Sequence, residues 1–360
     1  MGASESLLPV ALWINHAFSN VYNFCQLLRP SDQNKGFPGG LKIYLSHDNP
    51  QFVARNMADE FFLESQGRES YVDWAIEIGQ KNRINLLWAF REARNLAERA
   101  RDLAKIGVTL MVCASPDILD ILNDKAAFYA HIDKETKRLP AEYSDLLCPR
   151  HRVVGNLEAF SGAVKEFEAQ GYQVSFKPAQ AIYAQGFKII VSPEKALKAY
   201  MSSDPYRTTL AEAEAKLAQD PVFRRLLVME TLPGPEYSVD VLAKEGRLIR
   251  ATIRLKPQRA GSPEKLVYNE TILALAQKLT KMFQLSHIFN LQLMDSPEGL
   301  KILEINPRAA GGLYYSALGG INYPYWAARL ALGASEDLIP EQAYDLWVAQ
   351  AYQPFVYETA

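Results

Sequence analysis

Short apolar runs alternate with amphipathic segments along the first third of the chain. Apolar runs that are typical of strands cover residues 10–15, 41–46, 84–88 and 108–113, and helical spacing covers residues 18–28, 71–80 and 91–106. Runs of this length and recurrence at three and four residues predict strands and helices, respectively. Strands and helices that alternate in this order predict a parallel sheet with helices on its faces.

The rest of the chain mixes the two kinds of element less regularly. The pattern predicts helices that begin near residues 124, 157, 193 and 271, and strands over residues 174–178, 187–191, 227–230, 289–294 and 300–305. It also predicts a hairpin of residues 237–243 and 248–255 that turns at Gly246. This mixture indicates that an α+β part follows the α/β part.

Composition excludes several classes of protein. The 360 residues allow two or three domains, and the net charge of -2 provides no basic surface for non-specific binding of nucleic acid. No apolar run is long enough to cross a membrane and no signal peptide is evident, so we expect a cytoplasmic protein. The three cysteines lack the spacing of a metal site. His16 follows the first strand and either faces a cleft or is an ordinary loop histidine.

A motif near the end of the last predicted strand carries the clearest chemical signal. Glu304 and Asn306 lie two residues apart on that strand, and Arg308 follows them. Residues at this spacing point to the same face of a strand. Carboxylate and amide oxygens suit Mg²⁺, and an arginine beside them suits a phosphate. Taken alone, the motif also fits a buried strand whose end carries a solvated Glu and Asn.

Three other polar residues, Lys177, Glu230 and Gln292, also stand on apolar strands. Burial of such groups is costly unless they have a partner. One lysine at a strand edge can extend its ammonium to water. Five polar residues on apolar strands instead suggest a shared polar ligand.

The order of these motifs resembles that of the ATP-grasp superfamily, and within it the synthetase domains of carbamoyl phosphate synthetase. The chain is also similar to the ATP-grasp proteins of tellurite-resistance gene clusters. The resemblance covers about residues 120–335 and rests on Asp124-Lys125, Phe176-Lys177-Pro178, Glu230 to Asp240 (ETLPGPEYSVD), Asn290-Leu-Gln292 and Glu304 to Arg308 (EINPR).

The resemblance implies an α/β (α+β) fold class and three domains. A Rossmann-like pre-ATP-grasp domain would cover residues 1–118, and a two-lobed ATP-grasp fold would follow. Its small domain or lid would cover residues 119–225, and its C-terminal domain, with the metal site, residues 226–360. A nicotinamide-dependent dehydrogenase is disfavoured, because no G-x-G-x-x-G follows the first strand.

By position, the resemblance implies ATP and Mg²⁺ (or Mn²⁺) as cofactors. Lys125 and Lys177 would bind the phosphates, Glu230 the adenine edge and Glu236 the ribose. The loop from Gln180 to Gly186 would close over the phosphates. The metal ligands would be Gln292, Glu304 and Asn306, with Gln292 also at the nucleotide; Arg308 and Lys177 would act on the transferred phosphoryl group.

A basic run on the predicted hairpin adds a further candidate. It consists of Arg250, Arg254, Lys256 and Arg259, and Arg254 and Lys256 share a face. We expect Arg254 to be catalytic, with part of the run holding the substrate carboxylate or the acylphosphate. The alternative is a solvated hairpin edge protected by charge.

The implied activity is a ligase that joins a small carboxylate to an amine through an acylphosphate. Its partners would be ATP and these substrates, without nucleic acid or membrane. The phosphate loop, however, contains Gly186 alone, with Tyr183, Ala184 and Gln185 beside it, so its backbone approaches a phosphate less easily. A nucleotide-binding regulatory protein that no longer ligates therefore stays an alternative. A homodimer is also left open, because residues 313–326 fit either core or interface.

Overall fold

The computed structural model describes residues 8–16, 20–29, 36–37, 39–64, 70–180, 185–259 and 261–351. They form two compact units. Unit 1 comprises the described residues of Met1–Leu119, Tyr237–Leu291 and Asn306–Ala360, and unit 2 comprises those of Asp120–Glu236 and Gln292–Ile305. The division at residues 1–118, 119–225 and 226–360 remains a prediction, because unit 1 joins segments from both ends of the chain.

The N-terminal part of unit 1 is a parallel sheet, as the sequence predicts, with one additional strand, over residues 60–63, that the sequence did not predict. Its strands are β1 (Val10–Asn15), β2 (Leu41–His47), β3 (Glu60–Leu63), β4 (Leu86–Ala89) and β5 (Thr109–Met111). They lie in the order β3-β2-β1-β4-β5, and every neighbouring pair is parallel. The expected α/β architecture is confirmed for this part of the chain.

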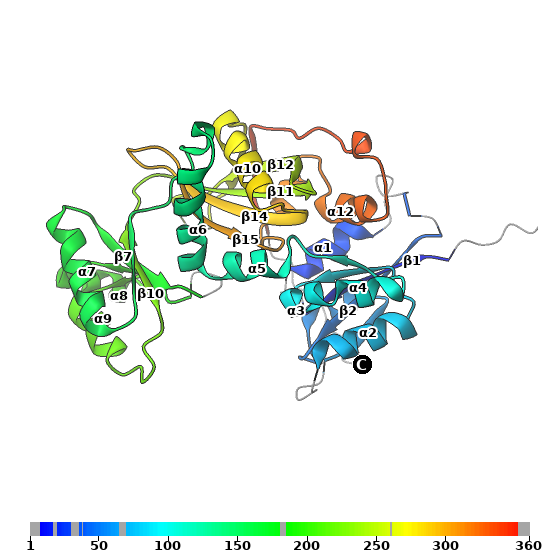
Figure 1. Ribbon diagram of the computed structural model, residues 1–360, viewed down its shortest axis with the longest axis horizontal. Helices are drawn as coiled ribbons and strands as arrows, with labels where there is room; N and C mark the ends of the chain where they lie inside the picture. The colour runs from blue at the N-terminus through cyan, green and yellow to red at the C-terminus, as the bar shows by residue number, and fades with distance from the viewer. Residues whose placement is uncertain are drawn as a thin grey trace, which may run out of the picture. The chain divides into compact units, whose positions relative to one another are not determined.

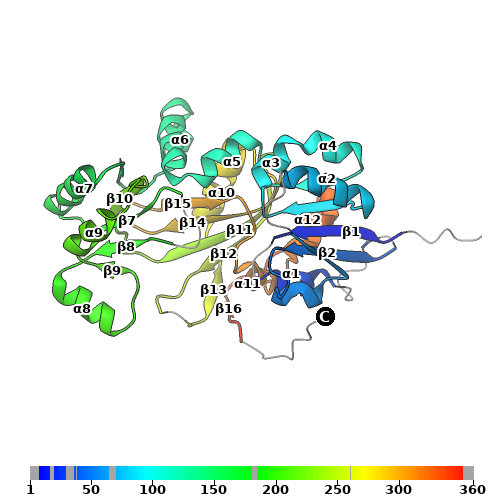
Figure 2. The ribbon, with the colours of Figure 1, turned by 90° about the horizontal axis from the view of Figure 1, so that it is seen from below.

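Helices cover both faces of this sheet, because alternate residues of each strand are apolar on both sides. Leu12 and Ile14 pack into one core cluster with α1 (Val21–Leu28). Trp13 packs into the opposite cluster with α2 (Tyr71–Lys81) and α4 (Ala100–Lys105). Figure 2 shows α1 on one side of β1 and β2, and α2 and α4 on the other.

One helix prediction is wrong in this region. The single helix expected over residues 91–106 is two short helices, α3 (Ala93–Glu98) and α4, separated at Arg99. The first of them also begins two residues later than expected, where the side chain of Asn15 binds the backbone before α3. Its Oδ1 accepts from the Phe90 N–H (2.6 Å), and its Nδ2 donates to the Arg91 carbonyl (3.0 Å).

A six-stranded sheet contains β15 (Lys301–Asn306), β14 (His287–Met294), β11 (Glu236–Lys244), β12 (Arg247–Leu255), β13 (Glu264–Val267) and β16 (Leu346–Val348), in that order. The predicted hairpin is confirmed as β11 and β12, which pair antiparallel. Glu245 and Gly246 turn it with φ of 49° and 77°, a backbone region that glycine tolerates well. The other elements here are α10 (Glu270–Met282), α11 (Leu313–Ala317), α12 (Tyr323–Ala331) and η3 (Glu336–Leu338).

The aromatic-rich segment of residues 313–326 lies largely in the core of unit 1. Leu313, Ile321, Tyr323 and Tyr325 are buried in the same cluster as Phe24. For these residues, the core interpretation is confirmed. Among the described residues, no helix is both long and apolar enough to cross a membrane.

Unit 2 contains a small sheet in the order β6-β10-β7-β8-β9. Its core cluster joins strand residues such as Phe176 and Val228 to Phe160 and Ala213 of two helices, α7 (Leu157–Ala169) and α9 (Leu210–Leu217). Figure 1 shows α7 and α9 beside β7 and β10. The strands of this sheet are β6 (His151–Val154), β7 (Val174–Pro178), β8 (Lys188–Ile190), β9 (Arg207–Thr208) and β10 (Leu226–Glu230).

The described residues form five further helical elements, which are η1 (Val53–Met57), α5 (Pro116–Asn123), α6 (Lys125–Arg138), η2 (Ala141–Tyr143) and α8 (Pro193–Met201).

Candidate functional site

The first turn of α6 places Lys125 at the end of β7. Asp124 caps the helix, because its carboxylate accepts from the backbone N–H groups of Ala126 (3.0 Å) and Ala127 (3.1 Å). The Lys125 N–H donates to the Ala179 carbonyl (2.9 Å), directly after β7. The predicted helix start at Asp124-Lys125 is confirmed, and this bond joins the two segments that carry Lys125 and Lys177.

Lys125 forms an ion pair with Glu304, with 3.1 Å between Nζ and Oε2. Two hydrogen bonds hold β15 in place: the Ile302 N–H donates to the Leu147 carbonyl (2.7 Å), and the Tyr129 hydroxyl donates to the Leu303 carbonyl (2.9 Å). The side chains of Lys125 and Glu304 are only 13% and 19% exposed. Lys125 is therefore not a freely solvated lysine on a helix surface.

Lys177 lies on β7 beside this pair, with its ammonium 5.9 Å from the centre of the Tyr129 ring. The pKa of Lys177 is lowered to about 8, mainly by burial. The nearby Glu304 charge opposes this shift, and the Lys125 charge adds to it. Among the residues that the structure describes, none makes a hydrogen bond or an ion pair with the Lys177 ammonium. A largely buried cation of this kind is costly unless an anion joins it.

The segment expected to cover the phosphates lies partly outside the described residues, since residues 181–184 are not among them. At its start, Gln180 donates to Asp124 (3.1 Å). At its end, Gly186 has φ of 73°, and a Cβ there would lie 2.8 Å from the Pro178 ring. Packing against Pro178 and the positive φ both require glycine at residue 186.

Glu230 ends β10 and is 8% exposed. Its carboxylate accepts from the Arg150 N–H (2.8 Å), and the next backbone N–H, of Thr231, donates to the Gln173 carbonyl (2.7 Å). The hydroxyl of Thr231 is buried and has no hydrogen-bond partner among the described residues. A polar ligand at the end of β10 would meet this hydroxyl, which the sequence reasoning missed.

The strand register separates Glu230 from Lys177. Glu230 pairs with Val174, whereas Lys177 pairs with Leu227, so the two lie three residues apart along the strands. That distance is about 10 Å at 3.4 Å per residue. The other two residues expected at the nucleotide stand on neighbouring elements. Glu236 begins β11, and its charge acts on Lys177; Gln292 is half-buried on β14, beside β15 in the sheet.

Asn306 ends β15, and Arg308 folds back onto it. The Arg308 N–H donates to the Asn306 carbonyl (2.7 Å), and its Nη2 lies 3.5 Å from Asn306 Oδ1. Nη1 donates to the Ala309 carbonyl (3.2 Å). Both side chains are half-buried. The guanidinium is thus fixed beside the amide oxygen on the face of β15 that Glu304 shares.

Arg254 occupies a different environment from the one expected. It is 1% exposed, and its Nε, Nη1 and Nη2 donate to Asp240 (2.9 Å), Glu264 (2.6 Å) and Ser238 (2.9 Å). The expected direct contact with substrate is incompatible with this burial, and the alternative of a solvated hairpin edge is also wrong for Arg254. Lys256 does share its face, because its ammonium reaches the same Glu264 (3.1 Å).

Solved structures share the fold of this chain. One is the biotin carboxylase domain of 2-oxoglutarate carboxylase from Hydrogenobacter thermophilus, which was crystallised with MgADP, ADP and bicarbonate. It superimposes with a TM-score of 0.61 at 14% identity, and the match covers 91% of this chain and 70% of that chain. An L-amino acid ligase from Bacillus licheniformis gives a TM-score of 0.59 at 13% identity, covering 90% and 74%. The chain has the ATP-grasp fold. This confirms the fold class that the sequence resemblance implies.

Sequence comparisons agree with the ATP-grasp fold. Residues 222–354 match the family model described as "ATP-grasp in the biosynthetic pathway with Ter operon". The large chain of the arginine-specific carbamoyl phosphate synthase of Geobacillus stearothermophilus is 23% identical over 326 residues. That alignment covers 86% of this chain and 28% of the relative, so the chain spans little more than a quarter of the relative's length. Both resemblances predicted from the motifs are thereby confirmed.

Proposed function

We propose that this protein is an ATP- and Mg²⁺-dependent ligase that joins a carboxylate to an amine through an acylphosphate. The observation that carries the proposal is the environment of Lys177. Its ammonium is largely buried beside the Lys125–Glu304 pair, and no described residue pairs with it. A phosphate group would supply the anionic hydrogen-bond partner that no described residue gives the Lys177 ammonium.

The described residues also fit the remainder of a nucleotide. The buried Thr231 hydroxyl lacks a partner at the end of β10, about 10 Å along the strands from Lys177. A nucleotide with its phosphates at Lys125 and Lys177 and its base near Thr231 satisfies both ends. Glu230 then acts mainly by fixing the Arg150 backbone, and Glu236 is the candidate for the ribose.

The metal-binding candidates have the chemistry of a hard cation site. Gln292, Glu304 and Asn306 offer amide and carboxylate oxygens, the ligand type of Mg²⁺ and Mn²⁺. Glu304 is paired with Lys125 in this structure, so Lys125 would turn toward the phosphates when Glu304 binds the metal. A bound Mg²⁺ would supply charge neutralisation on the phosphates.

In the proposed reaction, a carboxylate oxygen of the substrate attacks the γ-phosphorus, and the bond to the bridging oxygen of ADP breaks. The amine nitrogen then attacks the acyl carbon, phosphate leaves, and the nitrogen loses a proton. Lys177 and Lys125 hold the phosphate oxygens, and Arg308, fixed against Asn306, neutralises the charge of the transferred group.

A nucleotide-binding regulatory protein is the second candidate. One observation favours it: Gly186, the glycine of the expected phosphate loop, is required by its packing against Pro178. That glycine is therefore not by itself an indication of phosphate contact. The similarity to ligases supports the first candidate instead.

Release of ADP separates the two candidates. The full chain is incubated with ATP and Mg²⁺ while single and paired amino acids and small carboxylic acids are offered, and ADP and phosphate are measured. A ligase releases both products in proportion to the coupled product. The regulatory protein is identified if MgADP binds but no substrate pair leads to release of ADP and hydroxylamine traps no acylphosphate. Absence of MgADP binding overturns both candidates.

A further inference from the structure

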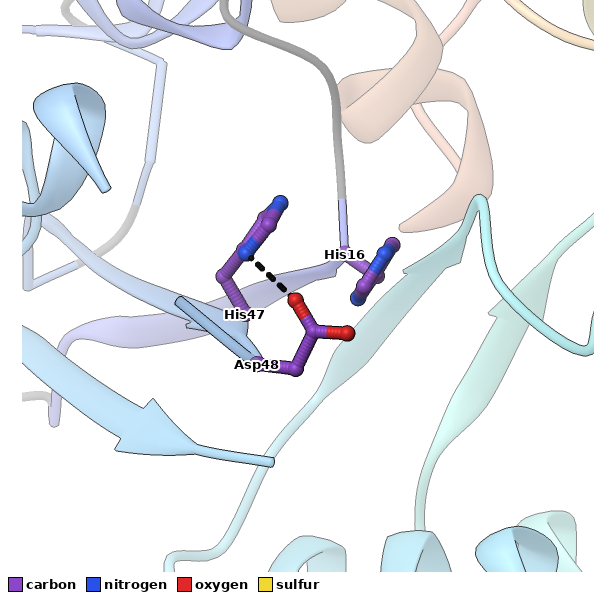
Figure 3. Close-up of side chains that lie close together, drawn as sticks. All are labelled: His16, His47 and Asp48. Carbon is purple, nitrogen blue, oxygen red and sulfur yellow. Dashed lines mark ion pairs between the residues drawn. The ribbon is translucent and has the colours of Figure 1, made fainter. Parts of the chain in front are cut away.

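Charged side chains gather at the carboxyl ends of the parallel strands in unit 1. His16 follows β1, His47 ends β2 and Asp48 follows it, Glu64 follows β3 and Arg91 lies two residues after β4. We call these five residues the edge cluster. Figure 3 shows three of them, His16, His47 and Asp48, close together at the ends of β1 and β2.

The position of the edge cluster is the usual place for a ligand in an open α/β sheet. Ligands of such sheets bind outside the carboxyl ends of the strands, where the strand order reverses. In the order β3-β2-β1-β4-β5 that point lies between β1 and β4. These are the strands that lead to His16 and Arg91.

Glu64 forms the buried floor of the edge cluster. Its side chain is 2% exposed and accepts from Ser46 Oγ (2.7 Å), the Tyr71 hydroxyl (3.0 Å) and Arg91 Nη1 (2.9 Å), while His16 Nδ1 lies 2.8 Å away. Burial raises the pKa of Glu64, but the hydrogen bonds of His16 and Ser46 hold it below its usual value. Glu64 is therefore a fixed charge that orients Arg91 and His16.

Arg91 keeps hydrogen-bonding capacity that Glu64 does not use. The polar contacts of its guanidinium, with Glu64, His16 and Asp48, all involve Nη1. Nε and Nη2 make no hydrogen bond with any described residue, and the side chain is 34% exposed. This pair of N–H groups has the spacing that binds both oxygens of a carboxylate.

Asp48 offers the opposite charge next to Arg91. It is 29% exposed, with one oxygen 3.1 Å from His47 Nδ1 and the other 3.6 Å from Arg91 Nη1. The edge cluster thus presents a guanidinium edge and a carboxylate side by side. A ligand that carries both a carboxylate and an ammonium matches this arrangement.

The two imidazole rings argue against a shared metal ion. Ligand atoms of His16, His47 and Asp48 lie within 4.8 Å of one another. However, the rings stack with centroids 4.3 Å apart and planes within 8°, and His47 also stacks on Phe52 at 4.2 Å. An imidazole lone pair lies in the ring plane, so one ion cannot lie in two parallel, separated planes.

The edge cluster also lies near the loop that carries Arg308. Asn20 donates to the carbonyl of Ala310 (3.3 Å), two residues after Arg308. Asn20 follows His16 by four residues, a span of at most about 14 Å in a fully extended chain. A ligand at His16 and Arg91 is therefore within a short distance of the segment next to Arg308.

From this geometry we infer that the edge cluster binds a free α-amino acid, with its carboxylate on Nε and Nη2 of Arg91 and its ammonium on Asp48. The inference that this amino acid is the amine substrate rests on the proposed function. The binding itself does not, because every group involved belongs to the parallel-sheet part of unit 1.

Calorimetric titration of the full chain with each of the twenty standard amino acids tests the inference, with and without MgADP. At least one amino acid binds at one equivalent, and its N-acetyl and carboxamide forms bind at least tenfold more weakly. Asp48→Asn and Arg91→Lys each weaken binding by roughly ten- to a hundredfold, the range of charge-assisted hydrogen bonds. Arg91→Lys keeps the charge opposite Glu64, and Glu77→Gln, an exposed carboxylate on α2, is the matched control without effect.

The outcomes distinguish this inference from the proposed function. Binding of MgADP with no amino acid bound in either condition overturns the inference and leaves the nucleotide site standing. The inference is also overturned if Asp48→Asn leaves amino acid binding unchanged. It is overturned as well if the protein binds one equivalent of Zn²⁺ or Co²⁺ and His16→Ala abolishes that binding. Amino acid binding without any MgADP binding supports the inference and removes the proposed ligase.

Discussion

Two cations on strands, the buried Arg254 in unit 1 and the half-buried Lys177 in unit 2, have opposite electrostatic environments. All three nitrogens of Arg254 donate hydrogen bonds, two of them to carboxylates. Lys177 has an aromatic ring and three charged residues near it, but no hydrogen bond or ion pair with any described residue. Both residues looked alike in the sequence, as basic residues on apolar strands.

The difference predicts a structural role for Arg254 and a ligand-binding role for Lys177. A fully paired buried charge has its desolvation offset by its own partners, so it needs nothing from outside. A cation removed from water without such partners has a lowered pKa instead, as Lys177 does. The cost of its desolvation is offset only when an anionic ligand binds. Burial alone therefore does not identify a site; incomplete pairing does.

The largest expected effect is on stability, from Arg254→Met. This change leaves Asp240 buried without its cation and leaves Glu264 with Lys256 alone, and removal of one partner of a buried ion pair costs about 3–5 kcal/mol. We expect the free energy of unfolding to fall by that amount in urea titrations.

The control for Arg254→Met is Lys256→Met, which removes a 31% exposed lysine from the same Glu264. A partly exposed pair contributes less than about 1 kcal/mol. Equal stabilities of the two variants, or a folded Arg254→Met protein of unchanged stability that loses activity alone, would contradict the structural role.

The second effect is on ligand affinity, from Lys177→Met. Loss of a charged hydrogen-bond donor to phosphate costs about 1.5–3 kcal/mol, roughly a ten- to hundredfold loss of MgADP affinity. Stability should be unchanged or higher, because a largely buried ammonium without a partner is removed. Calorimetric titration with MgADP and urea unfolding measure the two quantities on the same protein.

Lys165→Met provides the matched control, since Lys165 is an exposed lysine of α7 in the same unit. It should change neither quantity. The comparison between the two cations fails if Lys177→Met lowers stability by several kcal/mol while leaving MgADP affinity intact.

The sequence predicted much of the fold, because apolar periodicity determines which elements form. Four strands of the parallel sheet, all except β3, and the β11–β12 hairpin follow directly from such runs and from a turn that has positive φ at Glu245 and Gly246. The helix expected from residue 91 begins instead at Ala93, where the preceding backbone is held by Asn15, a residue 76 positions from Arg91 in the sequence. No local pattern contains that contact.

The site could be predicted only in part, for the same physical reason. The order of motifs singled out Lys125, Lys177 and Glu304, which the structure brings together, and their role at a nucleotide stays a prediction. It did not separate Arg254 from them, because the partners of Arg254 come from β11 and β13 and are known only once the strands pair. The unpartnered Thr231 hydroxyl left no sequence signal either, since pairing is a property of the folded chain.

A smaller effect on stability tests how rigidly Arg254 is held. A Cβ on Gly312 would lie 2.4 Å from Arg254 Nη1, whose three hydrogen bonds prevent it from moving aside. Gly312→Ala should therefore cost about 1–3 kcal/mol, as overpacking of a core does. The adjacent Gly311→Ala is the control, because a Cβ there meets nothing closer than Asn20 Nδ2 at 3.8 Å. If the two variants unfolded at the same midpoint temperature, Arg254 would be free to move aside.

A pH series tests Lys177 alone and gives the smallest expected change in MgADP affinity. Its pKa of about 8 in the folded protein lies below the ordinary value of 10.5, so the unfolded state binds more protons between pH 8 and 10.5. The destabilisation caused by Lys177 is thus fully present below pH 8 and disappears as the pH rises through that window. The stability difference between Lys177→Met and the unmodified protein should therefore become smaller as the pH rises from 8 to 10.5.

The affinity for MgADP should decrease with rising pH, falling several-fold from pH 7.5 to 9 as the free protein loses the ammonium. Lys177→Arg keeps its charge throughout and should give a flat profile, so a falling profile in this variant would assign the pH dependence to another group.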